Sequence, residues 1–436
     1  MTNALDLLRK HMLVDGYELV FDLEKSTPFY IHDKLSGNKI LDFYTFFASA
    51  PLGINHPKIK TKEFTKVIAN VALNKPSSSD SYTEEMAEFT ETFSKIAMKG
   101  LFKHLFLISG GTLAVENALK ASFDWKVKKN FAQGKEGVIG QEVIHFEKAF
   151  HGRSGYTLSL TNTYDPRKIA YFPKFDWPRI TAPIITFPLE EHLEKVKALE
   201  AQAINEIEEV IAKKGQDIAS LIIEPIQGEG GDNHFRSEFL QSLRKICDKN
   251  DILLIFDEVQ TGIGLTGKMW AFEHFVQPDI VSFGKKVQVC GIMVNDRIDE
   301  VSPNVFTESS RINSTWGGNL VDMVRSTKYL EIIEEDKLVD NARKVGEYLL
   351  KGLNDVCDES KEKMTNARGR GLMCAFDLPS QEYRDKMRRQ LFKNNVLILA
   401  CGERSIRFRP ALNMDEEHID EGLAIMAKSC RELSSK

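Results

Sequence analysis

The feature that most constrains the fold is an alternation, between residues 104 and 285, of short apolar runs with longer amphipathic stretches. Short apolar runs are typical of strands that are buried on both faces. The predicted strands are His104 to Ser109, Glu142 to Phe146, Tyr156 to Leu160, Ala219 to Glu224, Leu253 to Asp257 and Ile280 to Phe283. The helices predicted between them are Thr112 to about Lys129, Glu190 to Lys214 and Arg236 to Asn250. Strands that alternate with helices form a mostly parallel sheet, so we expect an α/β domain with its site at the carboxyl ends of the strands.

The pattern changes after Asn319, where long charged helices replace the alternation. Three helices are predicted there: one that ends near Glu335, one from Leu338 to Val356, and one that begins at Glu416. The strand-like segments between them are Leu372 to Leu378, Val396 to Leu399 and Ile406 to Phe408. This part of the sequence predicts a smaller α+β domain. A chain of 436 residues is long enough for two or three domains.

Composition excludes several classes of function. A formal net charge of -5, with 42% hydrophobic and 28% charged residues, gives no basic field that would bind nucleic acid. Acidic residues interrupt the start of the chain, and no apolar run is as long as a membrane helix, so we expect a cytoplasmic protein without a membrane partner. The six cysteines form no C-x-x-C pair, which predicts free thiols and neither a metal site nor a disulfide framework.

The strongest local feature is LIFDEVQTGIG, an apolar strand that ends in Asp257-Glu258, with Lys285 at the end of another strand 28 residues beyond Asp257. A nucleotide hydrolase uses such an acidic strand end to hold magnesium, but it requires a G-x-x-x-x-G-K-[ST] loop upstream, which this chain lacks. A desolvated lysine has a lowered pKa and can form an imine with an aldehyde. A pyridoxal ring needs a carboxylate beside its nitrogen, a role that suits Asp257. A core aspartate and a surface lysine remain the alternative.

Two further motifs follow predicted strands. Ser109-Gly110-Gly111-Thr112 joins a strand to a helix, where glycines allow close approach of the backbone and free amides face an anion. This tetrapeptide fits a phosphate site and, equally well, a plain turn with Thr112 as N-cap. In Phe150-His151-Gly152-Arg153, the aromatic ring suits stacking on a flat cofactor and the guanidinium suits a carboxylate. The following serine does not stand in a G-x-S-x-G nucleophile elbow.

Seven segments, in this order, resemble the class III (ω-amino acid) aminotransferases of fold type I. They are FLISGGTLAVENALK, FHGRSGYTLSLTN, IIEPIQGEGG, LLIFDEVQTGIGLTGKMWAFEH, PDIVSFGKKVQVCG, NSTWGGN and IRFRPAL. The resemblance covers nearly the whole chain. It implies pyridoxal 5'-phosphate as cofactor, a large α/β domain with a mostly parallel seven-stranded sheet, a smaller α+β domain, and an obligate homodimer with active sites at the subunit interface. The domains expected are an N-terminal segment joining the small domain (1–60), a large cofactor-binding domain (61–325) and a C-terminal small domain (326–436).

The resemblance also implies roles for individual residues. Lys285 would be the Schiff-base lysine, with Lys286 as a second choice. Asp257 would pair with the pyridine nitrogen and Gln260 would lie by the ring hydroxyl. The ring would lie between Val259 and Phe150, with His151 beside it. The phosphate would be held by Gly110, Gly111 and Thr112, and by Thr315 of the partner subunit with Asn313 close by. The family's common phosphate motif is Ser-Gly-Thr-Glu-Ala, whereas this chain has Gly110 to Ala114 as GGTLA.

Within the family, FYTFFASAPLGINHP, FPKFDWPRI, FGKKVQVCG and GRGLMCAFDLP are most similar to the L-lysine 6-aminotransferases. This implies transfer of the terminal amine of L-lysine to 2-oxoglutarate, giving 2-aminoadipate 6-semialdehyde, which cyclises, and glutamate. Arg153 and Arg407 suit the two carboxylates of 2-oxoglutarate, with Arg409 as a rival ligand. Glu229 would be a switch that pairs with one arginine during the amine stroke; a static ion pair is the alternative. Ornithine or 4-aminobutyrate as donor, another reaction on the same cofactor, and a cofactor-binding regulatory protein remain as alternatives.

Overall fold

A seven-stranded sheet forms the centre of the larger part of the molecule in a computed structural model that describes residues 3–360 and 363–434. In spatial order its strands are β3 (His104–Ile108), β11 (Cys290–Val294), β10 (Ile280–Phe283), β9 (Leu253–Asp257), β6 (Ile218–Ile223), β4 (Glu142–Phe146) and β5 (Arg179–Ile180). Only β11 runs antiparallel to its neighbours in this sheet. The predicted mostly parallel seven-stranded sheet is therefore confirmed.

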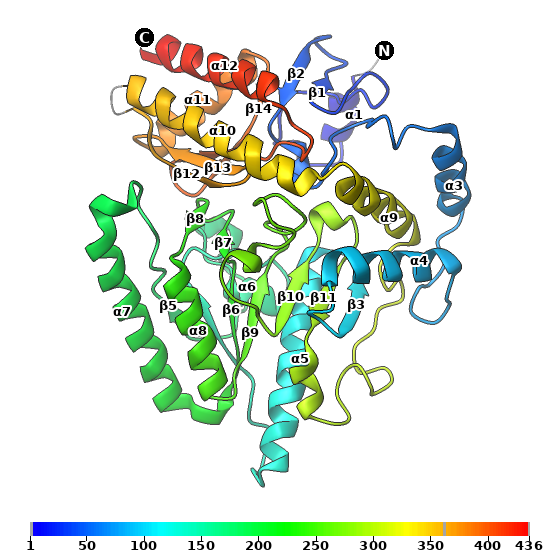
Figure 1. The fold of residues 1–436 in the computed structure, drawn as a ribbon, viewed down its shortest axis with the longest axis vertical. Helices are drawn as coiled ribbons and strands as arrows, with labels where there is room; N and C mark the ends of the chain where they lie inside the picture. The colour runs from blue at the N-terminus through cyan, green and yellow to red at the C-terminus, as the bar shows by residue number, and fades with distance from the viewer. Residues whose placement is uncertain (1–2, 361–362, 435–436) are drawn as a thin grey trace.

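Helices cover both faces of this sheet, because its strands have apolar side chains on both sides that must be buried (Figure 1). Leu253 and Ile255 of β9 lie in one buried cluster with α5 (Gly111–Ala132). The residues next to them in the strand, Leu254 and Phe256, pack in another cluster with α8 (Ser237–Lys249). With α7 (Leu189–Lys214), these are the three helices that the sequence predicts between the strands of this sheet. Side chains of successive residues in a strand point to opposite faces, so an uninterrupted apolar run indicates a sheet covered on both sides.

One predicted strand is wrong. Residues Tyr156 to Leu160 lie in a short helix, α6 (Gly155–Leu160), instead of a strand. Ser154 N–H donates to Thr157 Oγ1 at 3.2 Å, and Thr157 N–H donates to Glu116 Oε1 at 3.3 Å. Glu116 belongs to α5, so the acceptor that fixes the first turn of α6 comes from a distant part of the chain. Strands β5 and β11 were not predicted.

The smaller part of the molecule combines the C-terminal residues with the first part of the chain (Figure 1). Its four-stranded sheet has the order β12 (Thr365–Arg370), β13 (Met373–Asp377), β16 (Ser405–Arg407), β15 (Leu399–Cys401). A three-stranded sheet joins β1 (Tyr30–His32) and β2 (Lys39–Asp42) to β14 (Val396–Leu397). The pairing of β2 with β14 supports the division into 1–60, 61–325 and 326–436, which stays a prediction; the terminal ends of the outer two ranges lie outside the described residues.

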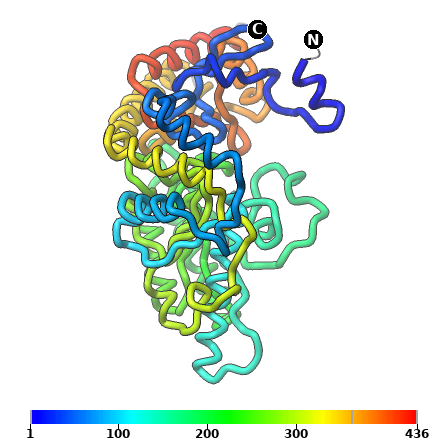
Figure 2. Tube along the Cα trace, turned by 90° about the vertical axis from the view of Figure 1, so that its right-hand side faces the viewer, coloured from blue at the N-terminus to red at the C-terminus, as the bar shows by residue number. Residues whose placement is uncertain are grey.

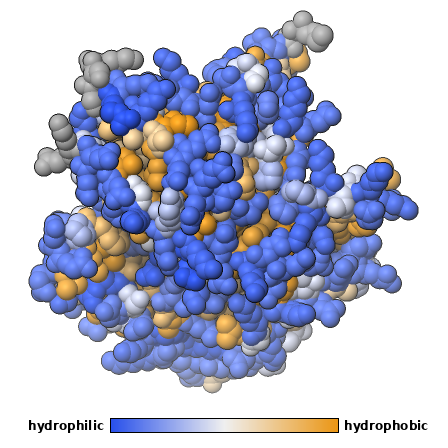
Figure 3. Space-filling view, turned by 45° about the horizontal axis from the view of Figure 1, so that its top comes forward, coloured by the Kyte–Doolittle hydropathy of each residue, from blue (hydrophilic) through white to orange (hydrophobic). Residues whose placement is uncertain are grey.

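The remaining elements complete the two parts. The helices are α1 (Ala4–Arg9), α2 (Thr45–Ala48), α3 (Lys62–Ala72), α4 (Glu84–Phe93), α9 (Leu320–Glu335), α10 (Leu338–Glu359), α11 (Gln381–Lys393) and α12 (Glu416–Ser434). A two-stranded ribbon is formed by β7 (Ile226–Gln227) and β8 (Asn233–His234). The face drawn in Figure 3 is mainly hydrophilic, with apolar residues scattered over it. Among residues 3–360 and 363–434, no helix has both the length and the apolar character that crossing a membrane requires.

Candidate active site

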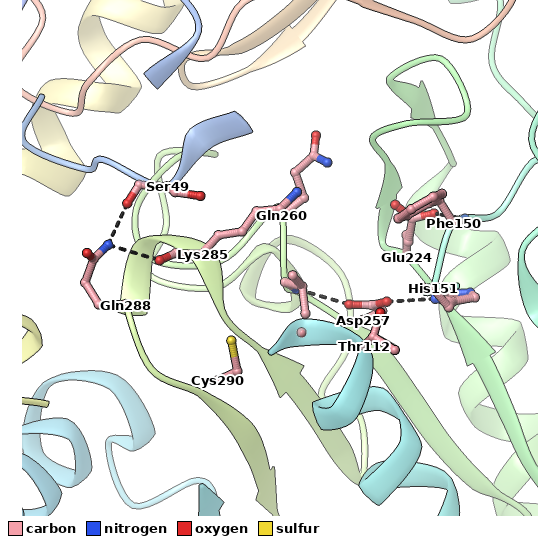
Figure 4. A pocket seen from close by; sticks show the side chains of 13 residues that line it. Ser49, Thr112, Phe150, His151, Glu224, Asp257, Gln260, Lys285, Gln288 and Cys290 are labelled. Carbon is pink, nitrogen blue, oxygen red and sulfur yellow. Dashed lines mark hydrogen bonds and ion pairs between the residues drawn. The ribbon is translucent and has the colours of Figure 1, made fainter. Parts of the chain in front are cut away.

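A cavity of about 440 Å³ lies where the carboxyl ends of several strands of the large sheet meet (Figure 4). This is the edge at which ligands bind in open α/β sheets, and the volume suits a small cofactor. The residues that line it are Ser49, Gly111, Thr112, Phe150, His151, Gly152, Glu224, Asp257, Val259, Gln260, Lys285, Gln288 and Cys290. Eight of the predicted site residues are therefore brought together: Gly111, Thr112, Phe150, His151, Asp257, Val259, Gln260 and Lys285.

Lys285 supplies an amine to this cavity. It follows β10 and has φ +49°, a left-handed conformation that is uncommon for a residue with a side chain and is often found at functional sites. Figure 4 shows its side chain extending toward Gln260, and no hydrogen bond from its Nζ is found among the described residues. Burial, with the positive charges of Arg407 and Arg409, lowers the pKa of Lys285 to about 8. Roughly a tenth of this amine is therefore neutral, and nucleophilic, at pH 7, far more than for a lysine of ordinary pKa.

The neighbouring lysine is used differently. Lys286 is buried, and its Nζ donates a hydrogen bond to the backbone oxygen of Gln260 at 2.6 Å. Its amine therefore anchors the turn that carries Gln260. This contact separates the two lysines, which the sequence alone left open, and favours Lys285 as the reactive amine.

Asp257 is a buried carboxylate held in one orientation. Its Oδ2 lies 2.8 Å from Nδ1 of His151, and its Oδ1 accepts hydrogen bonds from Val259 N–H at 3.1 Å and Ser282 Oγ at 3.2 Å. Figure 4 shows the pair formed by Asp257 and His151 at the side of the cavity. The other ring nitrogen of His151, Nε2, is buried and has no partner in the described part of the chain. The site thus presents a fixed negative charge to a group that enters the cavity.

The start of α5 forms an anion cradle beside Thr112. Gly110 is the N-cap residue with φ +110°, and neither a side-chain cap nor an acidic residue occupies the first turn. A Cβ on Gly111 would lie 3.0 Å from Cγ1 of Val259, a tight contact, so glycine lets the start of the helix lie against the cavity wall without displacing that side chain. Gly110 itself lines a smaller adjacent cavity of about 220 Å³ that shares Gln288 and Cys290 with the main one. Free amides at the start of a helix bind phosphate without a metal.

Glu224 lines the cavity and was missed by sequence reasoning. Its carboxylate accepts hydrogen bonds from the backbone N–H groups of Phe150 at 2.9 Å and Gly228 at 3.0 Å. Burial raises its pKa to about 7, and the nearby His151 lowers it in part. Glu224 follows β6, so the strand-end argument applied to Asp257 would have found it. Ser49 and Gln288, which a hydrogen bond of 2.6 Å joins, come from loops that carry no such signal.

A cluster of charged side chains adjoins the cavity through Gln260. Nη2 of Arg407 lies 2.7 Å from Oε2 of Glu229, and its Nη1 donates to Oε1 of Gln260 at 3.2 Å. Nε of Arg407 is buried and has no partner among the described residues. Arg409 forms a two-pronged ion pair with the buried Asp232, so it is not available as a rival carboxylate ligand.

The same cluster contains a cation that the sequence did not indicate. Nζ of Lys168 lies 2.7 Å from Oε1 of Glu229, whose other oxygen binds Arg407. Burial favours the protonated carboxyl, but the positive charges of Arg407 and Lys168 outweigh it and hold the pKa of Glu229 below its usual value. Glu229 is therefore ionised and bridges two cations.

Three further predicted residues are exposed and lie outside the cavity wall. Arg153 is exposed, with Cζ of its guanidinium 5.8 Å from the centroid of the Phe150 ring. Asn313 and Thr315 are exposed in the segment before α9. Their predicted contact with the phosphate of a partner subunit stays a prediction.

Together these residues fit a flat, phosphorylated aldehyde. The amine of Lys285 matches the aldehyde, Asp257 a ring nitrogen, and the start of α5 the phosphate, while Phe150 and Val259 line the space between. Within residues 3–360 and 363–434, no group of three or more His, Cys, Asp or Glu side chains is arranged to hold a metal ion.

Comparison with known proteins gives one family, two relatives and one solved structure that match the chain. The model of the family described as aminotransferase class-III matches residues 13–430. The chain is 50% identical over 425 residues to the L-lysine-epsilon aminotransferase of Amycolatopsis lactamdurans, covering 97% of this chain and 94% of that protein. It is 34% identical to a probable mitochondrial 4-aminobutyrate aminotransferase of Caenorhabditis elegans, covering 94% and 88%. Among solved structures, lysine aminotransferase from M. tuberculosis in the internal aldimine form matches with a TM-score of 0.96 and 48% identity, covering 99% of both chains.

Proposed function

The chain belongs to the class III aminotransferases, and from that premise we propose that it transfers the terminal (ε) amino group of L-lysine to 2-oxoglutarate. Its cofactor is pyridoxal 5'-phosphate. The observation that carries the choice of donor is the 50% identity, across 97% of this chain, to an L-lysine-epsilon aminotransferase. The products would be 2-aminoadipate 6-semialdehyde, which cyclises because its α-amine can attack the aldehyde, and glutamate.

The site residues divide the chemistry among them. Pyridoxal phosphate, when bound, supplies an electrophilic carbon for the substrate amine and a ring that accepts electrons. Lys285 binds that carbon covalently at rest and, once displaced by substrate, moves the proton as general acid and base. Asp257, oriented by His151, keeps the ring nitrogen protonated. The amides at Gly110 to Thr112 hold the phosphate.

The two carboxylates of 2-oxoglutarate require two cations. Arg407, whose Nη2 pairs with Glu229, suits the carboxylate next to the reacting carbon once Glu229 releases it, and Arg153, beside Phe150, suits the other one. L-Lysine brings no carboxylate next to its ε-carbon, and a buried arginine without a partner would be costly in that stroke. Glu229 meets this need, because its carboxylate pairs with Arg407 at 2.7 Å. We therefore propose Glu229 as the group that leaves Arg407 when the oxo acid binds.

The proposed enzyme is a homodimer with active sites at the subunit interface. Support comes from Asn313 and Thr315, which are exposed and lie outside the cavity of their own chain although the family pattern places them at the phosphate. Analytical ultracentrifugation of the holoenzyme and of a Thr315→Ala variant, with the affinity for pyridoxal phosphate, tests this proposal. A monomeric, fully active protein would contradict it.

The pKa of Lys285, about 8, predicts how fast the protein without cofactor captures pyridoxal phosphate at different pH. Only the neutral amine attacks an aldehyde, so the rate should rise with pH up to about 8 and level off above it. An unperturbed lysine would continue to gain rate up to about pH 10.4. Stopped-flow measurement of the visible absorbance band, quenched with borohydride, gives this profile. A rate that still rises in proportion to hydroxide above pH 9.5 or so would show that burial does not lower this pKa.

The donor is tested by single-turnover reactions of the holoenzyme with L-lysine, ornithine, 4-aminobutyrate and β-alanine. We expect L-lysine to react with the highest kcat/KM, exceeding ornithine by roughly 10-fold or more, because a pocket discriminates one methylene by about 1–3 kcal/mol. Loss of the visible band measures the rate, and trapping of the aldehyde identifies the product. An equal or higher kcat/KM for ornithine or 4-aminobutyrate would overturn the choice of L-lysine.

A further inference from the structure

Lys168 belongs to a segment that stands out from the body of the molecule. This segment runs between α6 and β5 (Figure 2), and Lys168 ends its one-turn 3-10 helix, Pro166–Lys168. Its side chain folds back toward the cavity and is only 14% exposed. Nζ lies 5.8 Å from the ring centroids of both Phe150 and Tyr164. A lysine on a projecting segment is normally solvated, so this burial against two rings and a carboxylate calls for an explanation.

The contact between Lys168 and Glu229 leaves a surplus of charge. Glu229 provides one negative charge, with Oε1 at 2.7 Å from Lys168 Nζ and Oε2 at 2.7 Å from Arg407 Nη2. Lys168 and Arg407 provide two positive charges, while Arg409 is neutralised separately by Asp232. The group of Lys168, Glu229 and Arg407 therefore carries one net positive charge. One additional carboxylate would neutralise this charge, and 2-oxoglutarate supplies such a carboxylate when it binds as acceptor.

We propose that Lys168 is a positioning residue, which keeps Glu229 paired when the carboxylate of the acceptor takes its place on Arg407. This inference rests on the proposed function. A carboxylate that left a buried guanidinium without another partner would be an uncompensated charge, and that cost would oppose binding of the acceptor. Lys168 removes this cost, because it already pairs with Oε1 of Glu229. Only the contact between Oε2 of Glu229 and Arg407 has to break. An ammonium has three donors and no fixed fork, so it follows a carboxylate that rotates.

The proposal predicts that loss of Lys168 weakens binding of the acceptor and leaves the half-reaction with L-lysine nearly unchanged. In a Lys168→Met variant, Glu229 has Arg407 as its only cation, so it still serves the amine stroke but resists displacement by a dicarboxylate. We expect the Kd of the holoenzyme for glutarate, an unreactive dicarboxylate, to rise on the order of 10-fold. The KM for 2-oxoglutarate in the reaction of the pyridoxamine form should rise by a similar factor. The rate of the L-lysine half-reaction should change by less than about 2-fold, because Glu229 still neutralises Arg407.

Two variants serve as controls for this experiment. Arg167→Met removes a positive charge from the adjacent residue, whose side chain is 87% exposed and pairs with Asp165 instead of Glu229. It should leave the Kd for glutarate unchanged, which excludes a general effect of charge on the segment. Lys168→Arg keeps a cation in place and should restore most of the glutarate affinity that Lys168→Met loses. Calorimetric titration with glutarate gives each value without turnover.

A Glu229→Gln background distinguishes positioning from direct binding. When residue 229 carries no charge, nothing has to be displaced, so adding Lys168→Met should change the glutarate Kd by less than about 2-fold. The same 10-fold loss in both backgrounds would mean that Lys168 binds the ligand directly, and it would overturn the proposal, as would an unchanged Kd in Lys168→Met alone. If the wild-type enzyme bound no glutarate and did not react with 2-oxoglutarate, the proposed acceptor would be wrong together with this inference. If the wild-type enzyme bound glutarate and reacted with 2-oxoglutarate, but Lys168→Met had the same glutarate Kd as the wild type, the proposed function would stand and the role of Lys168 would be wrong.

Discussion

Replacing Lys285 with alanine is expected to reduce turnover by about 10⁴-fold or more and to remove the visible absorbance band that borohydride reduces. The reason is that one side chain has two tasks: it binds the cofactor covalently at rest and moves the proton during each stroke. Burial lowers the pKa of this amine to about 8, which suits both tasks, because both the neutral and the protonated form are then accessible near neutral pH. Steady-state kinetics with L-lysine and 2-oxoglutarate, and a spectrum before and after borohydride, measure the effect. Added pyridoxal phosphate should not restore activity.

The matched control for this substitution is the adjacent residue. Lys286→Ala removes a hydrogen bond of 2.6 Å to the backbone oxygen of Gln260 and leaves a cavity, so a loss of stability of about 1–3 kcal/mol is expected. The reducible band should persist, because Lys285 is still present. If Lys286→Ala lost the band and Lys285→Ala kept it, the assignment of the reactive amine would be reversed.

The second large effect is expected for Asp257→Asn, which should lower turnover by on the order of 10³-fold while the protein still folds and binds pyridoxal phosphate. Asparagine has nearly the same shape but no charge, so a proton on the ring nitrogen would lose its counter-ion and the ring would accept electrons poorly. The partner of Asp257, His151 at 2.8 Å, remains in place. Single-turnover kinetics with L-lysine should show the loss in the rate constant and not in the binding of the amine.

Glu258→Gln provides the comparison with Asp257, since both are buried carboxylates in successive positions. The carboxylate of Glu258 accepts hydrogen bonds from Thr261 Oγ1 and from the N–H groups of Ala271 and Phe272, and it does not line the cavity. Its replacement should lower Tm while turnover falls by less than about 10-fold. Loss of turnover in Glu258→Gln with retention in Asp257→Asn would contradict the role given to Asp257.

Prediction from the sequence works best where the physics is local. The strands around Asp257 and Lys285 are long enough, and apolar enough on both faces, to be recognised from their own residues. The same reasoning fails for Tyr156 to Leu160, because Glu116 in another helix fixes the first turn of α6. The sequence does not predict strand β11, because only the one-turn 3-10 helix Lys285–Val287 separates it from β10 and no amphipathic α-helix marks its start.

The charged side chains near the cavity show more clearly what the sequence cannot predict. Arg407 and Arg409 look equivalent in the sequence, yet Asp232 occupies one of them and Glu229 the other. Lys168 carries no signal at all, because its partner Glu229 is 61 residues away and the turn that carries it resembles any exposed loop. Which cation a carboxylate meets depends on how loops fold over the sheet edge, and that is a property of the tertiary structure.

The most direct test of the whole account uses L-lysine labelled with ¹⁵N at the ε-position and unlabelled 2-oxoglutarate. Mass spectrometry of the products follows the nitrogen. If the enzyme acts at the terminal amine, the label appears in glutamate, and the six-carbon product keeps its unlabelled α-nitrogen in the cyclised semialdehyde. If instead the glutamate is unlabelled and the label stays with a 2-oxo acid derived from lysine, the enzyme acts at the α-amine and the proposed function is wrong.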